Sequence, residues 1–119
     1  MLDFELEVAA VLGRGGSDLT GAAAHDAIIG YTILNDWSAR DLQRREMRVG
    51  LGPAKGKDFA STLGPWLVTA DEFQHRHRDG FLKLEMTVSV NGHLIGSDLL
   101  SNMGWPFAEL VASPAMWSP

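Results

Sequence analysis

The 119-residue sequence predicts one small α+β domain with a mainly β core. Residues 81–90 alternate between apolar and polar side chains and lead into Asn91-Gly92, the strongest short signal for a β-hairpin. Residues 28–34 form a β-branched apolar run that is typical of a buried strand. Every helical pattern in the sequence is short. We therefore expect strands joined by hairpins, with a few short helices around them.

Two strands and two helices are expected in the first part of the chain. Residues 2–12 alternate between apolar and polar side chains, which predicts a strand, and the glycines of residues 13–16 end it. Asp18 or Thr20 is expected to cap a short helix over residues 22–27.

The stretch YTILNDWSARDLQ joins the second strand to the second helix. The strand is expected over residues 28–34. Ser38 and Asp41 have the spacing of a capping box, in which each side chain accepts a hydrogen bond from the other's free backbone N–H. We therefore expect a helix that begins at Ser38 and runs to about Met47.

A Gly/Pro loop over residues 50–57 separates these elements from the second part of the chain. The remaining elements are expected to be strands over residues 63–69, 81–90 and 93–100 and a helix over residues 106–112. Pro65 is expected at the start of its strand or on a sheet edge, because proline donates no backbone hydrogen bond. Four tryptophans are expected to pack in the core: Trp37, Trp66, Trp105 and Trp117.

Composition excludes several classes of protein. The formal net charge is −5 and no long basic stripe is present, so we expect no nucleic-acid binding. The absence of cysteine excludes disulfides and thiolate sites, which fits the cytoplasm. The N-terminus carries three carboxylates and no basic region, so we expect no signal peptide. No apolar run approaches the roughly 20 residues of a membrane helix.

Three carboxylates are candidates for a metal site. On a strand, Glu5 and Glu7 point to the same face about 6.6–7 Å apart, where a divalent cation between them would relieve their repulsion. The alternative is an exposed edge strand with two ordinary carboxylates. Asp36 lies where a strand meets a loop and would complete an oxygen cage. Its alternative is a turn aspartate that bonds its own backbone.

Cationic and polar residues near Asp36 are candidates for substrate contacts. The LGPAKGKDF stretch lacks the spacing of a phosphate-binding P-loop, but its glycines would let a ligand approach, with Lys57 as a donor. Arg40 and Gln43 share a helix face and could bind a carboxylate. The alternatives are a solvated Lys57 and a surface ion pair of Arg40, for instance with Asp36 or Asp41. The His75-x-His77 pair is expected to lie on the surface.

Together these segments resemble the C-terminal catalytic domain of the fumarylacetoacetate hydrolase family. The resemblance is carried by DFELEVAAVLGR, GYTILNDWSARDLQ, LGPAKGKDF, TLGPWLVT, LEMTVSVNGHLIGSDLLS and SNMGWPFAELVA. It implies a mixed β-sandwich roll, here incomplete, with residues 1–119 as part of the catalytic domain. The sequences of these motifs are closer to the fumarylacetoacetase branch of the family than to the hydratase branch.

The resemblance also implies a site and a reaction. It assigns Glu5, Glu7 and Asp36 as ligands of Mg²⁺, Mn²⁺ or Ca²⁺. It assigns Lys57 as a catalytic group that also binds substrate, beside Arg40 and Gln43. The implied reaction is metal-dependent hydrolysis of a carbon–carbon bond in a small β-dicarbonyl or 2-oxo acid, of the kind met in aromatic catabolism. The alternatives are decarboxylation, hydration or isomerisation by the same family.

Departures from the family pattern suggest a chain cut at both ends. The family has a histidine upstream of the E-x-E strand that takes part in activating water, and a P-G-D motif downstream; this sequence contains neither. Two hypotheses follow. The chain is an enzyme of this family, expected as a cytoplasmic homodimer, or it is a non-catalytic remnant that binds at most a cation or a partner chain.

Overall fold

The computed structural model describes residues 1–112, so Trp117 lies outside the described residues. The chain divides into two compact units. Unit 1 comprises Met1–Ala9 and Thr32–Trp66, and unit 2 comprises Ala10–Tyr31 and the chain from Leu67 onward. Within residues 1–112, no helix is long and apolar enough to cross a membrane.

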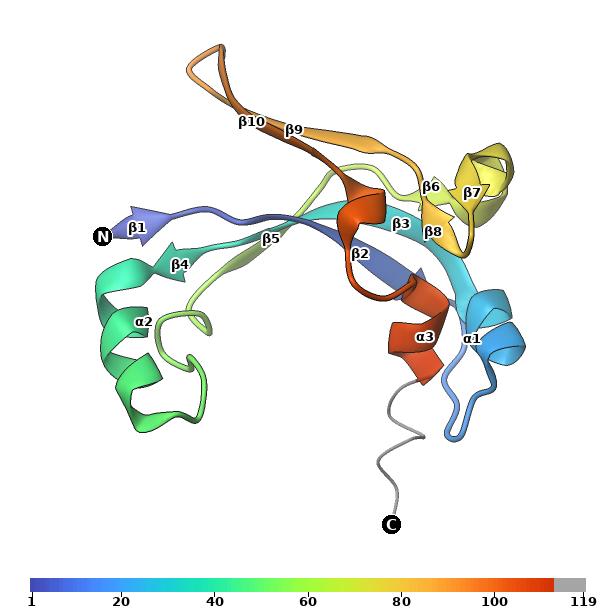
Figure 1. Ribbon diagram of the computed structural model, residues 1–119, viewed down its shortest axis with the longest axis horizontal. Coiled ribbons are helices and arrows are strands. Elements are labelled where there is room, and N and C mark those ends of the chain that lie inside the picture. Colours follow the sequence, from blue (N-terminus) through green and yellow to red (C-terminus); the bar gives the residue numbers. More distant parts are fainter. Residues whose placement is uncertain (113–119) are drawn as a thin grey trace. The chain divides into compact units, whose positions relative to one another are not determined.

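Most elements are short strands, as the α+β prediction requires (Figure 1). The strands are β1 (Leu2–Asp3), β2 (Leu6–Leu12), β3 (Ile28–Asp36), β4 (Ser38–Ala39), β5 (Ser61–Leu63), β6 (Val68–Thr69), β7 (His77–Arg78), β8 (Phe81–Leu82), β9 (Glu85–Val90) and β10 (His93–Leu99). The α-helices are α1 (Gly21–Ala27), α2 (Arg40–Glu46) and α3 (Phe107–Ala112), and the 3₁₀ helices are η1 (Met47–Val49), η2 (Ala70–Arg76) and η3 (Leu100–Asn102). The largest sheet has the order β2-β3-β5, with β6 also paired to β3.

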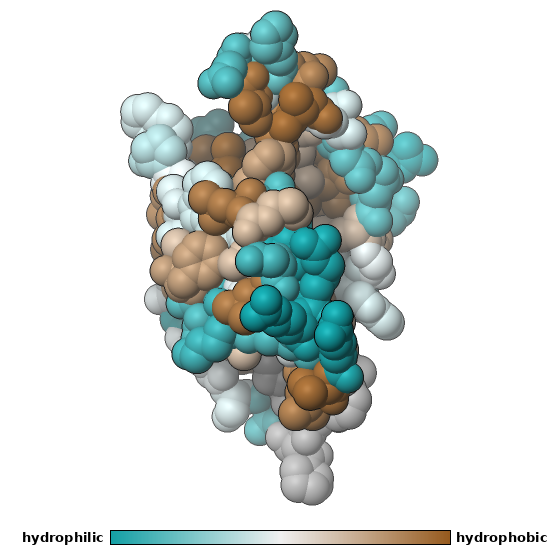
Figure 2. All heavy atoms as spheres, turned by 90° about the vertical axis from the view of Figure 1, so that its left-hand side faces the viewer, coloured by the Kyte–Doolittle hydropathy of each residue, from teal (hydrophilic) through white to brown (hydrophobic). Residues whose placement is uncertain are grey.

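Unit 1 is built from short antiparallel strand pairs, one α-helix and the 3₁₀ helix η1. Strand β1 pairs with β4, and the end of β3 pairs with β5 so that Asp36 lies opposite Ser61. Helix α2 follows β4, and the loop after η1 turns back beside α2 (Figure 1). Figure 2 shows hydrophilic side chains gathered over α2, whose exposed residues include Arg44 and Arg45. Gly50 and Gly52 have φ angles of 73° and 79°, the left-handed conformation that glycine adopts without strain.

The buried hydrophobic residues of the described part of the chain all lie in unit 2. The ring of Tyr31 lies 5.6 Å from Phe73 and 5.3 Å from Phe107, measured between centroids. The β9–β10 hairpin forms as the sequence predicts. Asn91 and Gly92 have φ angles of 52° and 79°, the positive values of a tight two-residue turn. The buried hydrophobic residues are Ala24, Ala27, Ile28, Tyr31, Leu82 and Leu100.

The predicted capping box is wrong. Ser38 belongs to β4 and is completely buried, with its Oγ 3.2 Å from the Asp36 carbonyl oxygen to which it donates. Helix α2 begins at Arg40, after Ala39, without a side-chain cap. The reason is strand pairing: Ser38 lies opposite Asp3 in the β1–β4 pair, which removes it from the helix end. For α1 the cap is Thr20 rather than Asp18, since Thr20 Oγ1 accepts a bond of 3.3 Å from the Ala23 N–H.

Three predicted strands are interrupted. Residues 4–5 separate β1 from β2, residues 64–67 separate β5 from β6, and residues 83–84 separate β8 from β9. The second break contains Pro65, which donates no ladder bond. Trp66 in this break and Trp105 are 78% and 64% exposed, so the expectation that they pack in the core is wrong. Helix η2 was not predicted.

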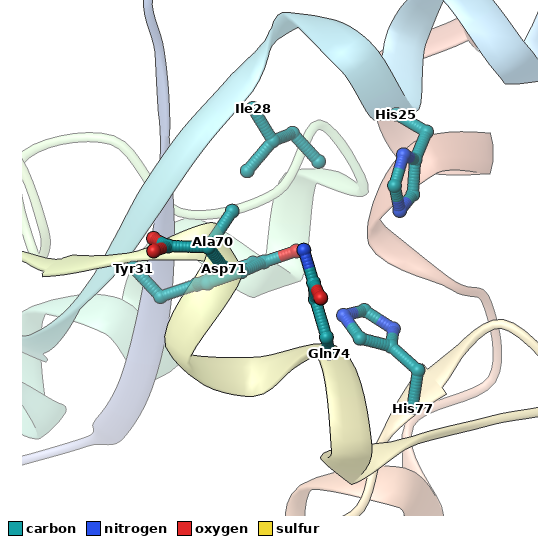
Figure 3. Close-up of a pocket in the computed structure, with 7 residues that line it drawn as sticks. All are labelled: His25, Ile28, Tyr31, Ala70, Asp71, Gln74 and His77. Atoms are coloured by element: carbon teal, nitrogen blue, oxygen red, sulfur yellow. The ribbon is translucent and has the colours of Figure 1, made fainter.

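Unit 2 also contains a cavity of about 340 Å³. Its lining residues are His25, Ile28, Tyr31, Ala70, Asp71, Gln74 and His77. Figure 3 shows the Gln74 amide next to the His77 imidazole, whereas the Asp71 carboxylate points away from both imidazoles. The two imidazole centroids are 5.9 Å apart. Burial, and to a smaller extent the charge of His25, lowers the pKa of His77. His77 is thus more buried than the predicted surface pair suggests.

We expect acid to destabilise this part of the chain through His77. Because the folded pKa of His77 lies below the ordinary value of 6.5, the unfolded chain binds more protons between the two pKa values. The free energy of unfolding should therefore fall as the pH drops through the ordinary value of 6.5 toward the lower folded pKa. Urea unfolding of His77→Gln should show a shallower pH dependence than wild type, whereas the exposed control His93→Gln should match wild type. An unchanged slope in His77→Gln would contradict this assignment.

Candidate functional site

Three carboxylates meet in unit 1. Glu5, Glu7 and Asp36 each offer an oxygen, and these oxygens lie within 4.8 Å of one another. Glu7 belongs to β2, and Glu5 lies just before it in the segment that joins β1 to β2. Asp36 is the last residue of β3. The structure thus brings together the three residues that the sequence predicts as metal ligands.

Backbone hydrogen bonds fasten the two chain segments that carry these carboxylates. The Asp36 N–H donates to the Glu5 carbonyl oxygen at 3.1 Å. In return, the Glu5 N–H donates to the Asn35 Oδ1 at 3.1 Å. This reciprocal pair fixes the position of Glu5 relative to Asp36 although 30 residues separate Glu5 from Asn35 in the chain.

Lys57 places a positive charge between two of the carboxylates. Its Nζ lies 2.6 Å from Glu5 Oε2 and 2.9 Å from Asp36 Oδ2, and its side chain is 16% exposed. Burial opposes the charge of Lys57, but the bonds to Glu5 and Asp36 outweigh it and raise the pKa of Lys57. The same ammonium, by hydrogen bonding, lowers the pKa of Glu5. Lys57 is therefore a charged partner of this cluster and not a solvated lysine.

Arg40 also turns toward the carboxylates. Its Nε lies 2.7 Å from Asp3 Oδ2, and its Nη1 lies 2.6 Å from Glu5 Oε1. Nη1 also donates to Gln43 Oε1 at 2.9 Å, which shows that Arg40 and Gln43 share a helix face. Arg40 thus forms ion pairs, as the alternative interpretation expected, but its partners are Asp3 and Glu5 rather than Asp36 or Asp41. The substrate-binding role of Arg40 and Gln43 remains a prediction.

The charges of this cluster do not balance. Four carboxylates (Asp3, Glu5, Glu7 and Asp36) surround two cations (Arg40 and Lys57), which leaves a formal charge of −2. Within the described residues Glu7 forms no ion pair. Burial raises the pKa of Glu7 first, and the charges of Asp36 and Glu5 raise it further. Hard oxygen donors with an excess charge of −2 fit a divalent cation such as Mg²⁺, Mn²⁺ or Ca²⁺.

Sequence reasoning missed three residues that build the site. Asp3 shares Arg40 with Glu5, and Asn35 fastens the Glu5 backbone. Glu46 accepts backbone bonds from the loop that leads to Lys57. Two signals were available: Asp3 precedes Glu5 by two residues on an alternating stretch, and Asn35 adjoins Asp36. Nothing local marks Glu46, because its partners lie 8–10 residues away along a loop.

Comparison with known proteins identifies the family. Residues 1–116 match the family model described as Fumarylacetoacetate (FAA) hydrolase C-terminal. The chain is 50% identical over 78 residues to the fumarylacetoacetase of Arabidopsis thaliana, a match that covers 61% of this chain and 18% of that protein. It is 37% identical over 110 residues to an oxaloacetate tautomerase of Bacillus subtilis, which covers 92% of this chain and 34% of that protein.

Solved structures show the same fold. The fumarylpyruvate hydrolase from Pseudomonas aeruginosa in complex with Mn²⁺ and pyruvate superposes with a TM-score of 0.80 at 26% identity, over 98% of this chain and 48% of that one. A 5-carboxymethyl-2-hydroxymuconate delta-isomerase from Mycobacterium smegmatis gives a TM-score of 0.75 at 35% identity, over 98% of this chain and 43% of that one. The chain spans less than half the length of each of these relatives. It belongs to the fumarylacetoacetate hydrolase family, whose members similar to it include both hydrolases and isomerases.

Proposed function

We propose that this chain forms part of an enzyme that hydrolyses a carbon–carbon bond in a small β-dicarbonyl or 2-oxo acid. In this proposal the chain contributes the residues that bind the metal ion and the acid substrate. One observation carries the proposal: the oxygens of Glu5, Glu7 and Asp36 lie within 4.8 Å of one another, and Lys57 bridges two of these residues. The similarity to fumarylacetoacetases supports the reaction class. Pyruvate, a 2-oxo acid, accompanies Mn²⁺ in the fumarylpyruvate hydrolase structure, which supports the ligand class.

In this proposal Glu5, Glu7 and Asp36 hold the divalent cation. A bound cation would supply Lewis acidity to the oxygens of the substrate. Three carboxylates accept Mg²⁺, Mn²⁺ and Ca²⁺ alike, so the donor set does not select among them. Asp3 and Arg40 keep Glu5 in place, since Arg40 bonds both carboxylates.

Lys57 acts at the oxygens on which negative charge develops. In hydrolysis, the oxygen of a water molecule bonds to a carbonyl carbon and the adjacent carbon–carbon bond breaks. The electron pair of that bond leaves with the other fragment as an enolate, which then takes up a proton. The Lys57 ammonium offers positive charge and hydrogen bonds to the enolate oxygen. Unit 1 contains no histidine, so the group that activates water is not assigned to it.

A second candidate function is enol–keto tautomerisation of a 2-oxo acid. This reaction moves a proton between carbon and oxygen and needs no attacking water. The similarity to the oxaloacetate tautomerase, which covers 92% of this chain, also favours it. The same positive charge at Lys57 would stabilise the enolate in either reaction.

The homodimer expected from the sequence remains a prediction.

Metal binding should be visible as a gain in stability. At a Mn²⁺ concentration of about 100 times the dissociation constant, binding adds about 2.7 kcal/mol to the free energy of unfolding. Calorimetry should show a higher melting temperature for wild type in Mn²⁺. Asp36→Ala should abolish the rise, because it removes one of the three proposed ligands. The control Asp58→Asn, whose exposed carboxylate pairs with Lys55, should retain it. The absence of a rise in wild type would contradict the metal site.

Activity assays separate the two candidate reactions. With Mn²⁺ present, hydrolysis should convert an acylpyruvate into pyruvate and a second carboxylic acid, whereas tautomerisation should speed the decay of enol oxaloacetate absorbance without forming pyruvate. Lys57→Met should reduce either rate by about 10²-fold or more, the usual cost of losing one group that stabilises developing charge. Turnover of neither compound by the wild-type chain would favour the non-catalytic hypothesis.

A further inference from the structure

The Glu46 carboxylate lies at the end of α2 and binds the loop that precedes Lys57. It accepts hydrogen bonds from three consecutive backbone N–H groups, those of Ala54 at 2.9 Å, Lys55 at 2.6 Å and Gly56 at 3.0 Å. Hydrogen bonds to an ionised carboxylate are stronger than bonds between neutral groups. A carboxamide in this place would offer one accepting oxygen instead of two, so it could not satisfy all three donors equally.

Further contacts, besides the bond to Glu46, fix the position of Gly56, the residue before Lys57. Its carbonyl oxygen accepts a bond of 2.9 Å from the Ala39 N–H. The loop packs so closely on α2 that a Cβ built on Gly56 would lie 2.8 Å from the Gln43 backbone nitrogen. The Lys57 N–H donates to the Ala54 carbonyl oxygen at 3.0 Å, which closes the turn. The starting point of the Lys57 side chain is therefore fixed relative to α2.

This placement matters because a lysine side chain is long and loses rotamer freedom when it is held. The Nζ of Lys57 bonds Glu5 and Asp36 simultaneously at 2.6 and 2.9 Å. Movement of the loop away from α2 would carry the ammonium away from both carboxylates. Glu46 forms no ion pair in the described part of the chain, so its three backbone bonds are the contacts through which it acts.

We propose that Glu46 is a positioning residue, whose carboxylate holds loop 54–56 on α2 and thereby places the Lys57 ammonium between Glu5 and Asp36. The inference rests on the proposed function only for the task given to Lys57; the placement itself exists without metal or substrate. It predicts that Glu46 acts on the site entirely through Lys57.

The direct test measures how fast each lysine of the metal-free full chain reacts with acetic anhydride, mapped by mass spectrometry. Lys57, held between two carboxylates, should react slowly, and Glu46→Gln should speed its reaction by about tenfold, the equilibrium effect of losing one bond to a charged group. Lys83, exposed and in unit 2, provides the internal reference. Asp58→Asn, which removes a carboxylate from the same region without touching a backbone N–H, should leave the Lys57 rate unchanged.

A second measurement asks whether Glu46 acts through Lys57. The Lys57 ammonium occupies carboxylate oxygens that a cation would use, so Lys57→Met should lower the Mn²⁺ dissociation constant measured by titration calorimetry. Glu46→Gln should lower it in part. In the Lys57→Met background, Glu46→Gln should have no further effect, because no ammonium remains to be placed. A merely structural role for Glu46 would change the affinity equally in both backgrounds.

Each outcome decides the inference. An unchanged Lys57 rate in Glu46→Gln, or an equal rise at Lys57 and Lys83, overturns it. If Glu46→Gln does not fold, Glu46→Asp keeps the charge with a shorter reach and should give the same selective rise at Lys57. If wild type binds no Mn²⁺, the proposed function fails, while the acetylation rates still test the placement of Lys57.

Discussion

The arrangement of unit 1 depends on holding like charges close together. Two unit charges about 4 Å apart repel by roughly 4 kcal/mol at an effective dielectric constant of about 20. The oxygens of Glu5, Glu7 and Asp36 approach one another within 4.8 Å, so the fold must compensate their repulsion. Lys57 and Arg40 compensate part of it by pairing with Glu5 and Asp36 or Asp3, whereas Glu7 forms no ion pair within the described residues. This unbalanced charge is the reason why we propose that the cluster binds a further cation.

The surrounding structure keeps that cluster from relaxing. Paired strands fix Asp36 opposite Ser61, and the bonds between Asn35, Asp36 and Glu5 tie the two acidic segments together. The cations are placed by different means. Arg40 begins α2 directly after β4, whereas Lys57 is delivered by a loop that Glu46 binds to the same helix. One short helix thus supplies one cation and anchors the other.

Patterns within a few neighbouring residues correctly predicted the features that depend only on those residues. The Asn91-Gly92 turn needs only two residues with positive φ, and the shared face of Glu5 and Glu7 needs only strand alternation. What failed depends on pairing between distant segments. Ser38 has a capping pattern, but its register opposite Asp3 makes it a buried strand residue. The partners of Arg40, 35 and 37 residues away, could not be ranked from spacing alone. The family match, by contrast, was readable from the motifs, and it covers residues 1–116.

We propose that Glu5, Glu7 and Asp36 form one divalent-cation site whose negative charge Lys57 compensates only in part when the ion is absent. A crystal structure of the full chain grown with Mn²⁺, with data collected at the manganese absorption edge, tests it most directly. We expect one anomalous peak bonded to oxygens of all three carboxylates, with the Lys57 ammonium displaced from at least one of its two present partners, Glu5 and Asp36. An ion bound elsewhere, or no ion while Lys57 still bridges Glu5 and Asp36, would contradict it.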